Sequence, residues 1–266
     1  MERRIGFIGA GRIVEVMLKA LGPAIGYGNI ALWNRTRERA DRLAAEFSVE
    51  VAPSIAELAE RSDWLLLAVK PHAVAEVLSE AALHVGSGSV LVSMAAGVRI
   101  EAIKRHFTVP PPVVRIMPNL PMSVGLGMTA VAADPSVPKA TVDEVVALFA
   151  KAGRARAVEE RLFDVVTALS GSGPAFAFLF IESLADGAVL NGMARELAYE
   201  FAAQTVLGAA RIILDSDKHP GELKDVVASP AGTTMAGIHT LERHAFRSIV
   251  MDAVDAAAKR SKELAQ

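Results

Sequence analysis

Near the N-terminus stands the stretch Ile5-Gly6-Phe7-Ile8-Gly9-Ala10-Gly11-Arg12-Ile13-Val14, which decides how the first half of the chain folds. A short apolar run leads into two glycines, and an apolar-periodic segment follows at once. Gly9 permits a tight turn, Gly11 lets a pyrophosphate approach the backbone, and the helix start supplies amides at Ala10, Arg12 and Ile13. The pattern predicts a strand, a turn and a helix that bind a dinucleotide. A simple strand-to-helix turn is the alternative.

Beyond this stretch, the first half of the chain alternates short apolar runs with amphipathic segments. Such alternation is typical of an α/β fold with a parallel sheet, in which strands buried on both faces are continuously apolar. We therefore expect a Rossmann-type parallel sheet domain over residues 1–160. The expected strands are Arg4–Ile8, Asn29–Trp33, Val49–Val51, Trp64–Val69, Ser89–Ser93, Val113–Met117, Met128–Ala132 and Arg154–Val158, and the expected helices are Ile13–Leu21, Arg37–Phe47, Ala73–Leu83, Ile100–His106 and Lys139–Lys151.

From Leu162 onward, helical periodicity dominates and strand signals vanish. Alanine and glycine are abundant, as at Ala185, Gly187 and Ala188, and small residues let helices pack closely. We expect an all-helical domain over residues 161–266. Because a helical half this apolar often completes its core with a second chain, we also expect a homodimer.

Composition excludes several classes of function. The 266 residues carry a net charge of −2 and no cysteine, so disulfides, thiolate zinc sites and a cysteine nucleophile are excluded. Neither a basic patch for nucleic acid nor a run of ~20 apolar residues for a membrane is apparent. The histidines match no metal-ligand spacing. We expect a cytoplasmic protein without a metal, a nucleic-acid partner or a membrane segment.

The residues after the second expected strand indicate which dinucleotide is bound. Sheets that bind NAD usually place an acidic residue there for the ribose 2′-hydroxyl. This chain has Asn34-Arg35-Thr36-Arg37 instead. An amide, a hydroxyl and two guanidinium groups suit a 2′-phosphate, so we expect NADPH in preference to NADH, with Asn34 and Arg35 among the ligands. A solvated helix start is the alternative for the two arginines.

Two further strand ends are expected to face the cofactor. Ala68-Val69-Lys70-Pro71 follows the third long strand, and Ala96 follows the next, among small residues that suit a nicotinamide ring. The carboxyl ends of parallel strands line the ligand crevice of open α/β sheets. A structural or solvent-exposed role is the alternative for Lys70.

The C-terminal half carries a second pattern, Ser229-Pro230-Ala231-Gly232-Thr233-Thr234-Met235-Ala236-Gly237. The proline stops the preceding helix, Gly232 allows close approach to the backbone, and the two threonines open a new helix. Free amides at such a helix start attract a carboxylate or a phosphate. A cofactor site and an anion site in one chain suggest a small anionic substrate.

Several segments together resemble the pyrroline-5-carboxylate reductase family. The matching stretches are Phe7–Gly11, Ala68–Pro71, Ala95–Gly97, Arg115–Asn119, Ser170–Ala175 and Leu223–Thr234, in the family's order and over nearly the whole chain. The resemblance implies a Rossmann domain followed by a dimerisation domain with interleaved helices. It also implies an active site completed by the partner subunit, and often further assembly as a pentamer of dimers.

The resemblance also implies a reaction, the reduction of the C=N bond of a cyclic imino acid to L-proline by a hydride from NADPH. We expect Val227, Ser229, Gly232 and Thr233 to bind the substrate, with the hydroxyl of Thr234 as the catalytic contact to the ring nitrogen. Asn119 is expected to face the nicotinamide and the substrate. The alternative for Asn119 is a loop amide that bonds its own backbone.

Departures from the family pattern keep other functions open. Leu120 stands where threonine is common, Phe176 where tyrosine is common, and Val14 and Ala231 replace alanine and glycine. A reductase of a six-membered imino acid is therefore one alternative, and a non-catalytic NADPH-binding protein is another. The related β-hydroxyacid dehydrogenases carry a catalytic lysine early in the second domain, and Pro174–Phe180 contains none.

Overall fold

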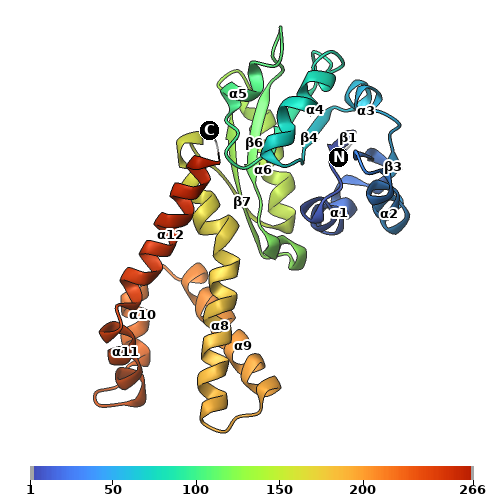
Figure 1. The fold of residues 1–266 in the computed structure, drawn as a ribbon. Coiled ribbons are helices and arrows are strands. Elements are labelled where there is room, and N and C mark those ends of the chain that lie inside the picture. The colour runs from blue at the N-terminus through green and yellow to red at the C-terminus, as the bar shows by residue number, and fades with distance from the viewer. Residues whose placement is uncertain (1–2, 265–266) are drawn as a thin grey trace. The chain divides into compact units, whose positions relative to one another are not determined.

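A computed structural model describes residues 3–264 of the chain. The chain divides into two compact units, residues 1–172 together with 256–266, and residues 173–255. We call them the sheet unit and the helical unit and describe each by itself. Figure 1 shows the elements of both units and their labels.

The sheet unit is built on one eight-stranded sheet in the order β3-β2-β1-β4-β5-β6-β7-β8. The order reverses at β1, which pairs in parallel with both β2 and β4. The expected strands are present, with ends shifted by one or two residues. Their bounds are β1 Ile5–Ile8, β2 Ile30–Trp33, β3 Glu50–Val51, β4 Trp64–Leu67, β5 Val90–Ser93, β6 Val113–Met117, β7 Gly127–Ala133 and β8 Gly153–Ala157.

Helices cover both faces of this sheet (Figure 1). Helices α1, α2 and α6 share one buried apolar cluster with alternate side chains of β1, whereas α3, α4 and α5 share a second cluster on the opposite face. Successive side chains of a strand point to opposite faces, so an unbroken apolar run serves both clusters. The bounds are α1 Arg12–Ile25, α2 Arg37–Phe47, α3 Ile55–Arg61, α4 Val74–Ala81, α5 Ile100–Lys104 and α6 Lys139–Phe149.

The expected parallel sheet is present, and one of its strands departs from the parallel direction. β7 runs antiparallel to β6, with Ile116 opposite Val131, while β8 returns parallel to β7. The segment between Met117 and Gly127 holds only a 3₁₀ turn, Leu120–Val124. A crossover to a parallel neighbour needs a dozen or more residues. The chain therefore turns back on itself at this point.

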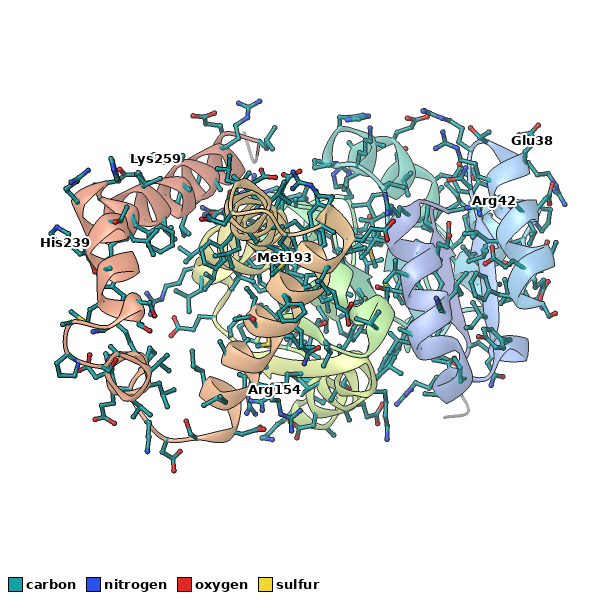
Figure 2. All side chains as sticks on the ribbon, turned by 90° about the horizontal axis from the view of Figure 1, so that it is seen from below. Glu38, Arg42, Arg154, Met193, His239 and Lys259 are labelled. Atoms are coloured by element: carbon teal, nitrogen blue, oxygen red, sulfur yellow. The ribbon has the colours of Figure 1, made fainter. Side chains whose placement is uncertain are left out.

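The helical unit contains α8 Gly173–Leu190, α9 Arg195–Asp215, α10 Pro220–Val227, α11 Thr233–Arg243 and most of α12 Phe246–Glu263. Helices α8 and α9 pack through the buried residues Ala185, Ala198 and Ala202. Met193, in the turn that joins them, packs against the same small cluster (Figure 2). Close packing over alanines leaves most of the larger apolar side chains exposed.

Two helices are long and apolar enough, by length and composition alone, to cross a membrane, namely Glu160–Leu190 and Arg195–Asp215. This is weak evidence for a membrane span, and the expectation of no membrane segment stays a prediction. A few charged and polar residues interrupt the apolar ones, so neither helix contains an unbroken apolar run of ~20 residues. Their side chains are largely exposed in the single chain. An apolar surface of this kind also suits contact with another protein chain.

The chain crosses between the units at two places. The short helix α7, Phe163–Val166, and a π-helical turn, Thr167–Ser172, still belong to the sheet unit. The last part of α12 returns to the sheet unit, where the Ser261 hydroxyl donates a hydrogen bond to Asp164 at 2.7 Å. The predicted division at residue 160 falls before this connecting segment. The return of the C-terminus depends on a long-range contact that periodicity alone does not indicate.

Candidate active site

A cavity of about 340 Å³ opens at the carboxyl ends of β1, β2 and β4 in the sheet unit. The strand order reverses there, and ligands of open α/β sheets bind at such a point. Eight residues predicted to bind the cofactor line it, namely Gly9, Ala10, Gly11, Asn34, Arg35, Ala68, Val69 and Lys70.

Gly9 lies at the centre of this crevice. Its φ of +120° suits glycine, and a Cβ there would collide with the backbone carbonyl of Ala68. Its amide donates to the carbonyl of Trp33 at 2.7 Å. Gly9 is therefore fixed by both neighbouring strands, which explains why the turn requires glycine.

Gly11 is different, because no heavy atom lies within 4 Å of the place where its Cβ would be. Gly11 is the N-cap residue of α1, and because glycine has no side chain, it makes no capping hydrogen bond to the first amides of the helix. The first amides of a helix have no intrahelical acceptor and carry the positive end of the helix dipole. Open space in front of these amides fits the pyrophosphate of a dinucleotide.

Asn34 holds the glycine turn in place. Its side-chain oxygen accepts from the amide of Ala10 at 3.1 Å, and its side-chain nitrogen donates to the carbonyl of Thr36 at 2.7 Å. The carboxamide thus joins the turn after β1 to the turn after β2. The direct contact of Asn34 with a cofactor stays a prediction, since its side-chain oxygen and its side-chain nitrogen each already have a partner in the chain.

The basic residues at the end of β2 are not the pair that the sequence analysis named. Arg35 lines the cavity, but the second arginine in the lining is Arg39. Arg37 pairs with Asp41 at 3.5 Å along the exposed side of α2. Arg37 and Arg39 both belong to α2, and a step of two residues rotates a side chain by about 200° around the helix axis. The two arginines therefore lie on nearly opposite sides of the helix.

Sequence reasoning missed the contribution of α4 and the turn before it. His72, Glu76 and Glu80 also line the cavity. Glu76 lies 3.6 Å from Arg35, carboxylate oxygen to guanidinium nitrogen. The signal was present in the sequence, because Glu76 and Glu80 are one helical turn apart and follow a strand end already assigned to the crevice.

Four predicted cofactor residues are not among those that line this cavity. Arg12 and Ile13 begin α1, Pro71 begins a 3₁₀ turn, and Ala96 follows β5. Arg12 and Ile13 would act through backbone amides at the helix start. These four assignments stay predictions.

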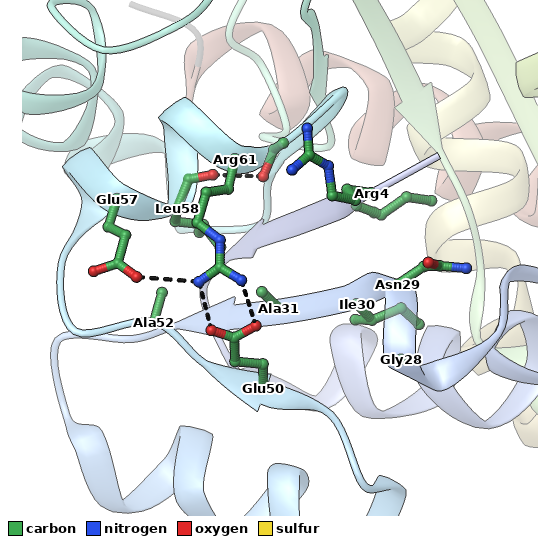
Figure 3. Close-up of a pocket in the computed structure, with 12 residues that line it drawn as sticks. Arg4, Gly28, Asn29, Ile30, Ala31, Glu50, Ala52, Glu57, Leu58 and Arg61 are labelled. Carbon is green, nitrogen blue, oxygen red and sulfur yellow. Dashed lines mark hydrogen bonds and ion pairs between the residues drawn. The ribbon is translucent and has the colours of Figure 1, made fainter. Parts of the chain in front are cut away.

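A second, smaller cavity of about 50 Å³ lies at the opposite ends of the strands. Figure 3 shows Arg61 of α3 across it, bonded to both carboxylate oxygens of Glu50 and to Glu57. These carboxylates raise the pKa of Arg61. The charged groups are already paired with one another, and the space is too small for a nucleotide.

Asn119 has a structural role in the sheet unit. Its side chain donates to the carbonyl and the hydroxyl of Ser170 at 3.1 and 3.2 Å, and accepts from the amide of Met128 at 2.8 Å. The residue is only 9% exposed. It joins the turn before β7 to the π-helical turn that precedes α8. Its contact with substrate or nicotinamide stays a prediction.

The anion site predicted near the C-terminus lies at the start of α11 in the helical unit. Gly232 is the N-cap without a side-chain cap, and Thr233 and Thr234 are the first two helical residues. The amide of Gly232 donates to the carbonyl of Ser229 at 3.0 Å, and Ala231 has a left-handed φ of 57°. The hydroxyl of Ser229 occupies the space that a Cβ of residue 232 would need.

This turn has the features that a carboxylate site requires. The amides at the start of α11 have no acceptor within the helix, and Thr234 is half-buried beside them. Val227 ends α10 and is exposed. The turn brings together Ser229 and Gly232, which Thr233 and Thr234 follow directly, whereas Asn119 belongs to the sheet unit. The contact of all these residues with the substrate stays a prediction.

The histidines outside the cavity form no site. His239 lies on the exposed side of α11 (Figure 2). Across residues 3–264, no three His, Asp or Glu side chains are arranged to hold a metal ion.

Known proteins resemble the chain over its full length. A family model for the pyrroline-5-carboxylate reductase dimerisation domain matches residues 160–264, and one for the NADP oxidoreductase, coenzyme F420-dependent, matches residues 4–97. The pyrroline-5-carboxylate reductase of Escherichia coli is 37% identical, with 100% of both chains covered. That of Methanosarcina acetivorans is 41% identical, with 99% of this chain and 98% of the relative covered.

Solved structures of the same family also resemble the chain over its full length. Pyrroline carboxylate reductase from Plasmodium falciparum with NADP bound has a TM-score of 0.91 at 30% identity, over 100% of this chain and 99% of that one. The pyrroline-5-carboxylate reductase of Coxiella burnetii has a TM-score of 0.90 at 31% identity, over 100% of both chains. The chain therefore belongs to the pyrroline-5-carboxylate reductase family.

Proposed function

We propose that this protein reduces Δ1-pyrroline-5-carboxylate to L-proline with NADPH, the last step of proline biosynthesis. The observation that carries the proposal is the full-length match to relatives of that name, with 100% of both chains aligned in one case. A dinucleotide cavity on the sheet unit and an anion-binding turn on the helical unit support it.

The cavity fits a nicotinamide dinucleotide. The space around Gly11 is open and would admit the pyrophosphate, and Arg35 and Arg39 line the same cavity, where they would hold the adenosine ribose of such a cofactor. Two guanidinium groups and no acid at the end of β2 support NADPH in preference to NADH. When bound, the cofactor supplies the hydride that reduces the C=N bond.

The helical unit supplies the substrate groups in this proposal. Backbone amides of Gly232, Thr233 and Thr234 would hold the substrate carboxylate, beside Ser229. The hydroxyl of Thr234 would contact the ring nitrogen. Between Ser229 and Ile238 there is no His, Lys, Asp or Glu. An imine that is protonated before it is reduced needs no acid there, so positioning and electrostatics carry the rate.

The assembly that we propose is a homodimer with interleaved helical units, in which each active site takes its cofactor half and its substrate half from different subunits. The match of residues 160–264 to a dimerisation family supports it. Further assembly as a pentamer of dimers is part of the same proposal. In the proposed dimer, the partner subunit covers the exposed apolar side chains of α8 and α9, so these helices need no membrane. We therefore propose a cytoplasmic location.

The test is an assay of NADPH oxidation at 340 nm with Δ1-pyrroline-5-carboxylate, beside the six-membered analogue and NADH. Rapid oxidation with the five-membered ring is expected. Turnover of only the six-membered ring would move the assignment to a related reductase. NADPH binding without turnover of either ring would instead indicate a non-catalytic protein.

The role of Thr234 has its own test. Thr234→Ala is expected to lower kcat/KM by about 100-fold or more, the usual scale for a positioned catalytic group. Thr240→Ala on the same helix is the matched control, because the Thr240 hydroxyl donates to the carbonyl of Ala236 within α11 and is not part of the proposed substrate site. An unchanged kcat/KM for Thr234→Ala would remove the residue from the mechanism.

A further inference from the structure

The ion pair between Arg35 and Glu76 lies at the cofactor cavity. Within residues 3–264, neither side chain forms another ion pair or hydrogen bond, and only the backbone carbonyl of Glu76 has a further partner, the Ser79 hydroxyl. Their closest atoms are 3.6 Å apart, and the two side chains are 76% and 70% exposed. Both residues line the cavity. An exposed pair of this kind is weak and easily exchanged for another partner.

Glu76 also supplies a carboxylate, the group that is missing at the end of β2. In sheets of this type, an acidic residue after the second strand accepts a hydrogen bond from the ribose 2′-hydroxyl. Here Asn34, Arg35 and Thr36 occupy that place. The carboxylate that reaches Arg35 comes instead from α4, on the other side of the crevice.

We propose that Glu76 sets the discrimination between the 2′-phosphorylated and the unphosphorylated dinucleotide. A 2′-phosphate must take Arg35 away from Glu76 and must lie near a carboxylate of like charge. A 2′-hydroxyl leaves the ion pair intact and can donate to the same carboxylate. Glu76 therefore weakens NADPH binding and supports NADH binding. This inference rests on the proposed cofactor role of the cavity.

The decisive variant is Glu76→Gln, which keeps the size of the side chain and removes its charge. We expect the ratio of the NADH Kd to the NADPH Kd to rise about three- to tenfold at low ionic strength, the scale for exposed charges that are a few ångströms apart. The rise shrinks as salt is added. The Kd values are measured by nucleotide fluorescence on the full chain without an imine, so the result does not depend on turnover.

The matched control is Glu101→Gln. Glu101 of α5 pairs with Arg105 at the same 3.6 Å, with exposures of 72% and 74%, and is not among the residues that line the cavity. This variant makes the same change in net charge and should leave both Kd values unchanged. Glu80→Gln is a second comparison, because Glu80 also lines the cavity, whereas the ion pair of Arg35 within residues 3–264 is with Glu76.

A double variant tests whether Glu76 acts through Arg35. In an Arg35→Gln background, Glu76→Gln should change the Kd ratio by less than half of its effect in the parent chain. An unchanged ratio in the Glu76→Gln single variant would overturn the inference. A change of the NADH Kd and the NADPH Kd by the same factor would also overturn it, because such a change would indicate an altered shape of the cavity. If NADPH binds as expected but no imine is reduced, the proposed reaction fails and the inference on Glu76 stands.

Discussion

The two units bury their apolar side chains to very different degrees. In the sheet unit Leu67 is fully buried and packs within a cluster covered by three helices. In the helical unit Leu179 is 64% exposed and Phe201 is 58% exposed. The sheet unit closes its core within one chain. The helical unit presents exposed apolar side chains and matches a dimerisation family, so we expect its stability and function to depend on assembly.

The largest effect should come from placing charge on the helical unit. We expect Leu179→Asp with Phe201→Asp to abolish the dimer and to lower kcat/KM by more than about 100-fold, because an unpaired carboxylate in an apolar interface is costly. Size-exclusion chromatography with light scattering measures the assembly. Leu83→Asp is the matched control, since Leu83 is an 85% exposed leucine of the sheet unit. A double variant that stayed dimeric and active would place the interface elsewhere.

A smaller effect is expected from the core of the sheet unit. Leu67→Ala should lower the free energy of unfolding by about 3 kcal/mol, since it leaves a cavity under three helices. Leu190→Ala, at an 87% exposed site on α8, should leave it nearly unchanged. Chemical denaturation at two protein concentrations measures both. A concentration-dependent loss for Leu67→Ala would show that the sheet unit also relies on assembly.

The ion pair between Asp134 and Lys104 is largely buried in the sheet unit. Asp134 is 8% exposed and bonds Lys104 at 2.6 Å and the amide of Ser136 at 2.8 Å. Burial alone would raise the pKa of Asp134, but the hydrogen bonds from Lys104 and Ser136 outweigh it and hold the pKa below its ordinary 3.8. Asp134→Asn should lower the free energy of unfolding by about 2 kcal/mol at neutral pH.

The sign of the pH dependence follows from the lowered pKa. The folded state binds the proton of Asp134 less readily than the unfolded state does, so the contribution of Asp134 is complete above pH 3.8 and is lost as pH falls through the lower, folded pKa. Acid titration of unfolding should therefore show a shallower loss below pH 4 in Asp134→Asn than in the parent. Equal slopes would contradict the role of the pair.

The smallest effect is expected at Trp64, which is 1% exposed although its indole Nε1 lacks a hydrogen-bond partner within residues 3–264. Trp64→Phe removes this unpaired donor and leaves a small void, and the two changes nearly cancel. We expect a change within about 1 kcal/mol, against about 4 kcal/mol for Trp64→Ala. A loss above 2 kcal/mol for Trp64→Phe would mean that the indole nitrogen is hydrated.

Sequence patterns predicted the features that depend on neighbouring residues. The glycine turn at Gly9 and Gly11, the buried strand that begins at Trp64, and the helix start at Thr233 all follow from local steric and hydrogen-bonding rules. The family and its two-part architecture followed from motifs distributed along the chain. These predictions are confirmed by the strand order and by the comparisons.

What the sequence did not predict depends on contacts between distant residues. Glu76 reaches Arg35 only because α4 packs beside the crevice. The start of α2 at Arg37 was predicted, but which face of α2 lies toward the cavity, and hence that Arg39 lines it instead of Arg37, depends on how the helix packs. The side chain of Asn119 is engaged by Ser170, which is distant in sequence. These pairings leave no trace in the periodicity of the sequence. Sequence patterns could therefore predict the site to which such a residue belongs, but not the residues that it contacts.

The return of α12 to the sheet unit makes the helical unit an insertion with two covalent junctions, one at residues 172–173 and one at residues 255–256. A single proteolytic cut in the turn Ser216–His219 would therefore release neither piece from the sheet unit. Recombination that exchanged the helical unit for another would have to match two junctions at once. An arrangement of this kind favours inheritance of the two units together, even though the groups proposed to bind cofactor and substrate lie on separate units.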